Sequence, residues 1–344
     1  MPGPYEPVDS PDSTTIFPYH DLEPPTITDV YRARSVVRRH LPRTPLVRSD
    51  ALSTAYDADV YLKREDTLPT GAFKVRGGIT LVSGIEDEFR SPGLIAASTG
   101  NHGQSIAYAG RQFDVPVVIA VPEGANPSKV EAMERLGAQV EHHGRDFDDA
   151  REWAETQATA EGYRYVHSAN EPALVAGVGT AGLEVVEDLP DVDYVFVPVG
   201  GGSGASGYCL TVGELTDAAV VGVQSDAAPG LYRAWRDGSL DPHDEMDTFA
   251  EGLATRVPFA LTMTLLRARL DDFVLVADDE LRDGMARLLR DERIVVEGAA
   301  ASGIAALDHY TSEIEGKTIV VQLSGRNVSP AKLSELLDRI DRDR

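Results

Sequence analysis

The sequence predicts an α/β protein built on parallel β-sheets, and three observations carry this prediction. From Gly93 onward, short segments rich in valine and isoleucine alternate with segments of helical periodicity. Such alternation is typical of parallel sheets covered by helices on both faces, so a doubly wound α/β fold is expected. The chain has 344 residues, of which 42% are hydrophobic and 26% charged, and this is enough for one large globular domain or two ordinary ones.

The region before Gly93 contains an arm, two helices and a strand. Residues 1–26 hold seven prolines and show little hydrophobic periodicity, which predicts an arm that lies over the fold or stays partly disordered. Residues 27–41 place apolar side chains three to four positions apart and predict a helix. A short strand is expected around Leu62, and a second helix from Phe73.

The remaining elements follow from the same two periodicities. Strands are expected at 93–98, 115–122, 138–143, 163–167, 192–199, 219–224 and 317–323. Helices are expected at 102–111, 129–136, 147–161, 205–215, 261–270, 279–290 and 298–310.

The composition is strongly acidic, with a formal net charge of −24 and only five lysines. Such a surface repels phosphates, so a nucleic-acid partner is not expected. A dense carboxylate surface stays hydrated in concentrated salt, where ions screen its self-repulsion. We therefore predict a halophilic protein, and an acidic protein of ordinary habitat is the alternative.

The chain shows no sign of membrane insertion or export. No run approaches the roughly 18 apolar residues that span a bilayer, and the N-terminus lacks the basic and apolar regions of a signal peptide. A cytoplasmic protein without membrane contact is expected. The single cysteine, Cys209, excludes an internal disulfide and a cysteine metal cluster.

The segment P-T-G-A-F-K-V-R-G, residues 69–77, places Lys74 where a turn becomes a helix. Burial and the positive end of a helix dipole both destabilise an ammonium group, and a lysine so placed is a candidate to form a Schiff base with a carbonyl cofactor. The alternative is an ordinary surface lysine on a first helical turn.

Two further turns between strand and helix have side chains and backbone suited to anions. P-V-G-G-G-S-G, residues 198–204, lets backbone N–H groups converge on a phosphate, although a tight turn is the alternative. It is neither a Walker loop nor a dinucleotide-binding fingerprint. S-T-G-N-H-G-Q, residues 98–104, is rich in hydrogen-bond donors and suits a carboxylate.

Together with L-S-G-R-N at 323–327, these motifs resemble those of the fold type II pyridoxal-phosphate enzymes, the tryptophan synthase β-like family. V-R-G-G after Lys74 resembles the serine/threonine dehydratase and serine racemase branch, and the similarity runs from about Pro45 to about Pro330. The resemblance implies two doubly wound α/β domains with parallel-rich sheets and the cofactor in the cleft between them. By that pattern residues 27–90 and 169–344 form the large cofactor-binding domain, and residues 91–168 form a small inserted domain.

The resemblance also assigns site residues. The catalytic residues it implies are Lys74 and Thr99. The residues expected to bind pyridoxal phosphate are Phe73, Lys74, Asn101, Gly200, Gly201, Gly202, Ser203, Gly204 and Ser324. The residues expected at the substrate carboxylate are Ser98, Thr99, Asn101 and His102, with a satisfied loop histidine as the alternative for His102.

The implied reaction is β-elimination of L-threonine or L-serine to a 2-oxo acid and ammonia, through a Schiff base on Lys74. Ser324 would meet the pyridine nitrogen, where a hydroxyl does not hold the ring protonated as a carboxylate would. Thr99 keeps open an amino-acid racemase, because the family's racemase has a serine acting as second base at this position. Dehydration of another 3-hydroxy amino acid, such as 3-hydroxyaspartate, and a non-catalytic ligand-binding relative are further alternatives.

Two departures from the family pattern bear on metals and on the site wall. Relatives bind a divalent cation through carboxylates where this chain has Gln224 and Gly230, so no metal is expected there. Arg326 stands where the family usually has glycine, and it either narrows the site or supplies a cation. By resemblance a homodimer or homotetramer is expected.

Overall fold

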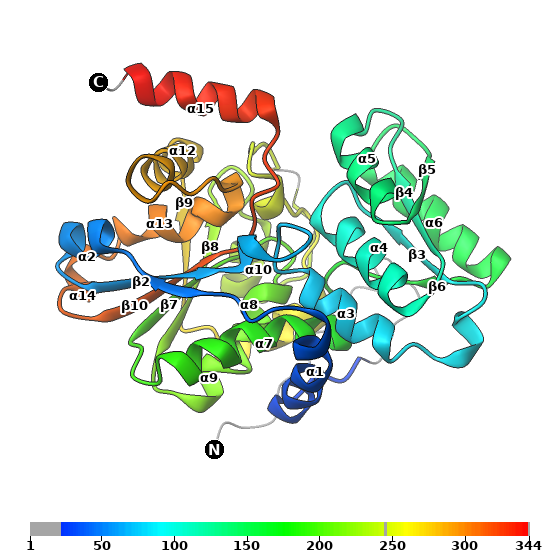
Figure 1. Cartoon of the computed structure of the whole chain (residues 1–344), viewed down its shortest axis with the longest axis horizontal. Coiled ribbons are helices and arrows are strands. Elements are labelled where there is room, and N and C mark those ends of the chain that lie inside the picture. Colours follow the sequence, from blue (N-terminus) through cyan, green and yellow to red (C-terminus); the bar gives the residue numbers. More distant parts are fainter. Residues whose placement is uncertain (1–21, 244–245, 343–344) are drawn as a thin grey trace. The chain divides into compact units, whose positions relative to one another are not determined.

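The computed structural model describes residues 22–243 and 246–342, which form two compact units (Figure 1). One unit, called the large unit here, contains Arg43–Phe73 and the described part of Ala181–Arg344. The other, the small unit, contains Lys74–Thr180 and the described part of Pro11–Pro42. Most of the arm predicted for residues 1–26 lies outside the described residues.

The large unit is built on a six-stranded sheet in the order β1-β2-β10-β7-β8-β9. Its strands are β1 (Leu46–Arg48), β2 (Asp59–Arg64), β7 (Tyr194–Pro198), β8 (Ala219–Ser225), β9 (Asp272–Val276) and β10 (Thr318–Leu323). Only β1 runs antiparallel to its neighbour. The sheet is thus parallel-rich, as the alternation of strands and helices predicts.

Helices cover both faces of this sheet. Strand β10 shows why: Ile319 and Val321 are buried in one core, whereas Val320 between them is buried in the other. The first core is closed by α2 (Asp50–Tyr56), α12 (Asp278–Arg287), α13 (Ser302–Leu307) and α15 (Pro330–Arg342). The second is closed by the end of α7 (Pro172–Asp188), α8 (Ser203–Cys209), α9 (Val212–Leu215), α10 (Gly230–Asp237) and α11 (Ala260–Arg269).

The small unit contains a four-stranded, fully parallel sheet in the order β5-β4-β3-β6. Its strands are β3 (Leu94–Ala97), β4 (Val117–Val121), β5 (Gln139–His142) and β6 (Arg164–Tyr165). Its helices are α1 (Ile27–His40), α3 (Val75–Ser83), α4 (Asn101–Phe113), α5 (Pro127–Arg135), α6 (Phe147–Glu161) and the start of α7. An alanine stripe on α6 packs on β3 and β4, and α4 contacts the same two strands and α3.

Every strand and helix expected from the periodicities is present, but three predicted helices differ in form. The helix predicted over 279–290 is α12 followed by a π-helical turn, Leu288–Glu292. The helix predicted over 205–215 is wrong as a single element, because the chain breaks between α8 and α9 at Thr211. The Thr211 hydroxyl donates to the Gly207 carbonyl at 3.0 Å, which turns the chain locally. The segment predicted at 298–310 begins as a 3-10 turn, Gly298–Ala301, ahead of α13.

The compact units do not coincide with the predicted domains. Helices α1 and α3, predicted to belong to the large domain, group with the four-stranded sheet because α3 packs on α4 and α1 packs on α3. The unit boundaries fall between Phe73 and Lys74 and again inside α7, after Thr180. The predicted domain boundaries themselves stay a prediction.

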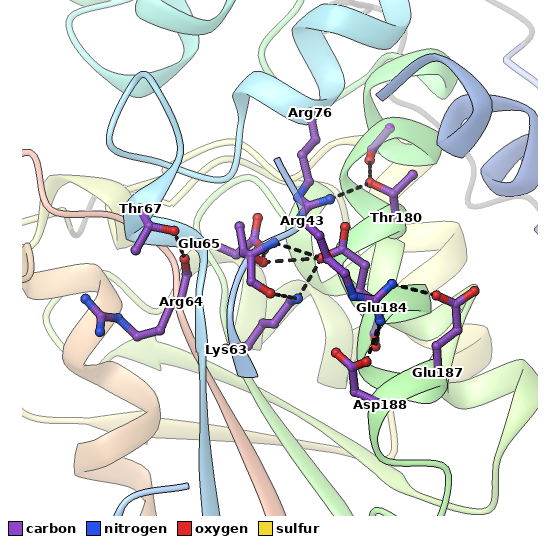
Figure 2. Close-up of polar contacts among 12 residues, drawn as sticks. Arg43, Lys63, Arg64, Glu65, Thr67, Arg76, Thr180, Glu184, Glu187 and Asp188 are labelled. Atoms are coloured by element: carbon purple, nitrogen blue, oxygen red, sulfur yellow. Dashed lines mark hydrogen bonds and ion pairs between the residues drawn. The ribbon is translucent and has the colours of Figure 1, made fainter. Parts of the chain in front are cut away.

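A buried ion pair fixes β2 to α7 inside the large unit (Figure 2). Lys63 is fully buried, and its Nζ lies 2.6 Å from Glu184 Oε2 and 3.0 Å from the Thr44 carbonyl oxygen. The Thr44 hydroxyl donates to Glu65 Oε1 at 2.6 Å, so a second buried carboxylate joins the network. Arg43 closes its outer side by binding Glu187 and Asp188, which lie on the same helix. A charge on a central strand is tolerated here because its partners are built in.

Candidate active site

The glycine-rich loop between β7 and α8 adopts a backbone that only glycine allows. Gly202 has φ +88°, in the left-handed region. A Cβ on Gly200 would lie 2.1 Å from the Gly252 carbonyl oxygen. The loop is held from behind, since Thr262 Oγ1 donates to the Gly201 carbonyl at 3.0 Å. The Gly201 carbonyl is thus engaged, and the predicted binding of an anion by the N–H groups of this loop stays a prediction.

Phe73 lies beside this loop in the large unit. A Cβ on Gly204 would be 3.2 Å from Phe73 Cε2, so the aromatic ring packs directly on the start of α8. The Phe73 N–H donates to the Ser324 carbonyl at 3.0 Å, and Ala72 pairs with Gly325 in an isolated β-bridge. The residue before the candidate lysine is therefore fixed between the glycine loop and the end of β10.

Ser324 is 3% exposed, and within the described part of the chain its hydroxyl makes no hydrogen bond. This hydroxyl is not one of the buried side-chain atoms that lack a partner, so it keeps contact with solvent, and a ligand atom can take the place of water there. The large unit thus presents one neutral hydrogen-bonding group, Ser324, and the glycine loop predicted to bind an anion, both adjoining Phe73.

Lys74 follows Phe73 in the chain and begins the small unit. It is partly buried directly before α3, and its Nζ donates to the Ser168 carbonyl at 2.9 Å. Its own carbonyl accepts from Ser105 Oγ at 2.7 Å, and a Cβ on Gly78 would lie 2.4 Å from that same hydroxyl. Burial lowers the pKa of Lys74 to about 8, so about one tenth of the amine is neutral at pH 7.

The turn between β3 and α4 is organised by Ser98. Its Oγ accepts the N–H groups of Gly100 at 3.2 Å and Gly103 at 2.9 Å. A Cβ on Gly100 would meet nothing within 4 Å, so open space adjoins the N-terminus of α4. The first N–H groups of this helix have no intrahelical acceptor, and Thr99 and Asn101 are both partly exposed beside them. The geometry suits the substrate carboxylate predicted to bind here. The Ser98 hydroxyl oxygen already accepts the N–H groups of Gly100 and Gly103, so it also stabilises the turn.

Two buried histidines lie close to Lys74 in the small unit. His102 Nε2 lies 3.2 Å from the Val166 carbonyl and must carry the proton, because a carbonyl only accepts. His167 Nδ1 accepts two backbone N–H groups and is therefore unprotonated. Burial, together with the charge on Lys74, lowers the pKa of each imidazole to about 3. Both rings are neutral, and any contact of His102 with a substrate carboxylate stays a prediction.

Each unit therefore assembles part of the predicted site. The large unit brings together Phe73, the glycine loop and Ser324, and the small unit brings together Lys74 and the 98–102 turn. Sequence reasoning missed Thr262 and the Ser168–His167 turn. A signal for His167 existed, since it directly follows a parallel strand and ligands bind at the carboxyl ends of such strands.

Gln224 and Arg326 depart from the family pattern, and both have defined surroundings. Gln224 Nε2 donates to the Leu253 carbonyl at 3.3 Å, and Gln224 Oε1 accepts from the Tyr232 N–H at 3.0 Å. Both ends of the amide are used by backbone groups. No cluster of metal-ligating side chains occurs among the described residues, and the absence of a divalent metal stays a prediction. Arg326 is exposed and lies against Gly71.

Comparison with known proteins decides the family. A sequence profile for pyridoxal-phosphate dependent enzymes matches residues 37–325. The chain belongs to this family. It is 35% identical over 315 residues to L-threonine ammonia-lyase of Thermotoga maritima, covering 91% of this chain and 78% of that one.

Solved structures agree on the fold. Processed threonine deaminase isoform 2 of Solanum lycopersicum superposes with a TM-score of 0.86 at 26% identity, covering 98% of this chain and 97% of that one. Serine racemase of Dictyostelium discoideum superposes with a TM-score of 0.83 at 28% identity, covering 89% and 99%. The predicted α/β fold of the tryptophan synthase β-like type is confirmed.

The residues present fit pyridoxal phosphate, the cofactor of this family. The glycine loop packs so closely on Gly252 and Thr262 that Gly200 and Gly202 leave no room for side chains, and the Ser324 hydroxyl makes no hydrogen bond within the described part of the chain. Lys74 provides a partly neutral amine. No helix in the described part of the chain is both long and apolar enough to cross a membrane.

Proposed function

We propose that this protein is a pyridoxal-phosphate-dependent ammonia-lyase that converts L-threonine or L-serine into the 2-oxo acid and ammonia. The relatives named as threonine ammonia-lyase and threonine deaminase support the reaction class. The observation that carries the proposal is the Lys74 amine: it follows Phe73, which packs on the glycine loop, and burial lowers its pKa to about 8, so that about half of the amine is neutral at that pH. A neutral amine in this place is the base that a β-elimination needs.

The residue roles follow from the two half-sites. Bound pyridoxal phosphate would supply an electron sink next to the substrate Cα, and the Lys74 amine is the group that would bond its aldehyde carbon between turnovers. The N–H groups of Gly200–Gly204 and the side chain of Ser203 would hold the phosphate, and Ser324 would hydrogen-bond the pyridine nitrogen. Phe73 would support the ring edge, and Asn101 would bond the 3′-oxygen.

On the substrate side, the 98–102 turn holds the carboxylate through Ser98, Thr99, Asn101 and the backbone at His102. Lys74 then removes the Cα proton. Because Ser324 is a hydroxyl rather than a carboxylate, it would not hold the pyridine nitrogen protonated, and this would favour early loss of the β-hydroxyl. The hydroxyl would take a proton from a nearby acid and leave as water, and hydrolysis of the released enamine would give the 2-oxo acid and ammonia.

Racemisation is the second candidate, and Thr99 is the observation that favours it. Its partly exposed side chain stands at the substrate turn, opposite in role to Lys74, and a structural neighbour is a serine racemase. The hydroxyl of Thr99 would return a proton to the other face of Cα. A different 3-hydroxy amino acid, such as 3-hydroxyaspartate, is the alternative substrate of the same residues.

The proposal extends to the setting of the enzyme. The net charge of −24 with five lysines supports a halophilic enzyme that needs concentrated salt, and we propose that it is cytoplasmic. We also propose a homodimer or homotetramer, and a large cofactor domain formed by 27–90 and 169–344 with residues 91–168 as the small domain.

One incubation tests the reaction. The purified protein with pyridoxal phosphate and L-threonine or L-serine in concentrated salt is assayed for the 2-oxo acid and for inverted amino acid. The 2-oxo acid in excess is expected. Lys74→Ala should abolish turnover, whereas Lys317→Ala, at an exposed lysine of the large unit, should not. Inverted amino acid in excess supports the racemase, and normal activity of Lys74→Ala contradicts the proposal.

A further inference from the structure

The turn formed by residues 166–170, called the histidine turn here, is fixed from inside by two buried imidazoles. His167 Nδ1 accepts the N–H groups of Ala169 at 3.1 Å and Asn170 at 2.9 Å. His102 Nε2 binds the Val166 carbonyl at 3.2 Å. The two side chains are 7% and 5% exposed, so water does not compete for these bonds.

A buried ion pair holds the base of the same turn. Arg164 forms a two-pronged contact with Glu171, in which NH2 lies 2.9 Å from Oε2. Glu171 is 2% exposed, and its Oε1 accepts the His167 N–H at 3.3 Å. Hydrogen bonds therefore hold the turn at Val166, at the His167 N–H and at the N–H groups of Ala169 and Asn170.

What this rigid turn presents is the carbonyl of Ser168, which accepts from Lys74 Nζ at 2.9 Å. The side chain of Ser168 plays no part in that bond, so the direction of the carbonyl depends on the backbone and hence on His167. Because both imidazoles are neutral, they fix the turn without adding positive charge beside the amine.

We propose that the histidine turn is the dock of the Lys74 amine, and that His167 is the positioning residue that directs the Ser168 carbonyl toward it. This inference rests on the proposed function, because it concerns the state in which the amine of Lys74 acts as a base. A neutral amine has two N–H groups and one lone pair. Donating one N–H to Ser168 fixes the nitrogen and leaves the lone pair to take the Cα proton. The ammonium that results keeps the same bond, so the nitrogen need not move when it gains the proton.

Three substitutions at His167 separate positioning from general stability. In His167→Asn, the amide oxygen can stand where Nδ1 stands and accept the same two N–H groups. In His167→Leu, a side chain of similar bulk accepts none. His167→Asp keeps an acceptor but adds a negative charge near Lys74, and it serves if His167→Leu does not fold. Thermal melting checks the folding of each variant.

The first readout does not depend on turnover. The full-length chain without cofactor is labelled with acetic anhydride across a pH series, and mass spectrometry gives the labelling midpoint of Lys74. Lys317, half-exposed in the large unit, is the internal reference. In His167→Leu the Lys74 midpoint should fall by about one pH unit, because the ammonium loses the Ser168 carbonyl as an acceptor while it stays buried. His167→Asn should stay within about 0.3 unit of the parent protein, and His167→Asp should raise the midpoint through its charge.

The second readout is steady-state kinetics of the cofactor-loaded enzyme. His167→Leu should lower kcat by about tenfold or more with KM changed less than about twofold, and His167→Asn should restore kcat. The dock is refuted if folded His167→Leu keeps the parent midpoint and kcat, or if His167→Asn is as impaired as His167→Leu. If His167→Asp is used in place of His167→Leu, a Lys74 labelling midpoint equal to that of the parent protein also refutes the dock. If the midpoints shift as expected but no amino acid is turned over by the parent protein, the dock stands and the proposed reaction fails.

Discussion

Gly202 allows the cofactor loop to be tested against a matched glycine elsewhere in the same unit. Gly202 has φ +88°, and Gly316 has φ +69°. A Cβ on Gly316 would meet nothing within 4 Å, whereas one on Gly202 would lie 3.0 Å from Thr262 Cβ and 3.1 Å from Leu266 Cδ1. Gly202→Ala and Gly316→Ala thus both place an alanine in the left-handed region of φ, but only Gly202→Ala brings a Cβ into close contact with neighbouring side chains.

The expected magnitudes follow from this difference. Gly316→Ala should lower the free energy of unfolding by about 1–2 kcal/mol, the cost of a left-handed alanine. Gly202→Ala should lose that amount plus about 1–3 kcal/mol for overpacking against α11. Because Thr262 must move, its bond to the Gly201 carbonyl is also disturbed, and the loop N–H groups lose their common direction. Affinity for pyridoxal phosphate should fall at least about tenfold, equivalent to about 1.4 kcal/mol.

Two measurements check these values. Urea unfolding of the chain without cofactor, in concentrated salt, compares the stability of the parent protein, Gly202→Ala and Gly316→Ala. Spectroscopic titration with pyridoxal phosphate then gives the three affinities, and Gly316→Ala should bind as the parent protein does. The reasoning is refuted if Gly202→Ala is no less stable than Gly316→Ala, or if it binds the cofactor normally.

Three further predictions concern charged and polar groups. Lys63→Met should lower the free energy of urea unfolding by about 3–5 kcal/mol, because the Glu184 carboxylate loses its ammonium partner in a largely buried place. The double variant Lys63→Met/Glu184→Leu should recover part of that loss. If both variants are as stable as the parent protein, the ion pair does not stabilise the fold. Burial lowers the pKa of Lys74 to about 8, so the neutral fraction of the amine grows from about one tenth at pH 7 to about nine tenths at pH 9. The value of kcat should therefore rise about ninefold over this range. A kcat that falls from pH 7 to pH 9 would be evidence against an amine base. Gln224 stands where relatives have a metal-binding carboxylate, and both ends of its amide bind backbone groups, so EDTA should not change the activity. If EDTA abolishes the activity and added Mg²⁺ restores it, a divalent metal site exists elsewhere in the protein.

The sequence was sufficient where local geometry sets the structure. Strand β10 could be predicted because its residues alternate between two cores, and the glycine loop because its backbone excludes side chains. Helix α7 was not predicted, since Gly177 and Gly182 lower helix propensity. The structure shows the need for them: a Cβ on Gly177 would lie 2.7 Å from Gly77 Cα, and one on Gly182 would lie 2.2 Å from Thr211 Oγ1. Close packing overrides propensity there.

Other parts of the site depend on contacts that leave no mark in the local sequence. Lys63 and Glu184 are 121 positions apart, and neither residue type predicts burial by itself. The Ser168 carbonyl is harder still, because a backbone acceptor is present at every residue and only the fold selects one. Such partners require the tertiary structure, even when the family motifs already identify Lys74.

The scarcity of lysine nevertheless carries structural information. Lys63 binds Glu184 and the Thr44 carbonyl, Lys74 binds the Ser168 carbonyl, and Lys317 and Lys332 each bind a carboxylate. Arginine cannot replace Lys74, because a guanidinium keeps its proton and can neither form the Schiff base nor act as the base. Nor does its wide planar fork suit the compact buried site of Lys63. In a chain where arginine supplies most of the positive charge, Lys63 and Lys74 therefore mark positions where the ammonium group itself is needed, and a lysine is worth inspecting as a site candidate in sequences of similar composition.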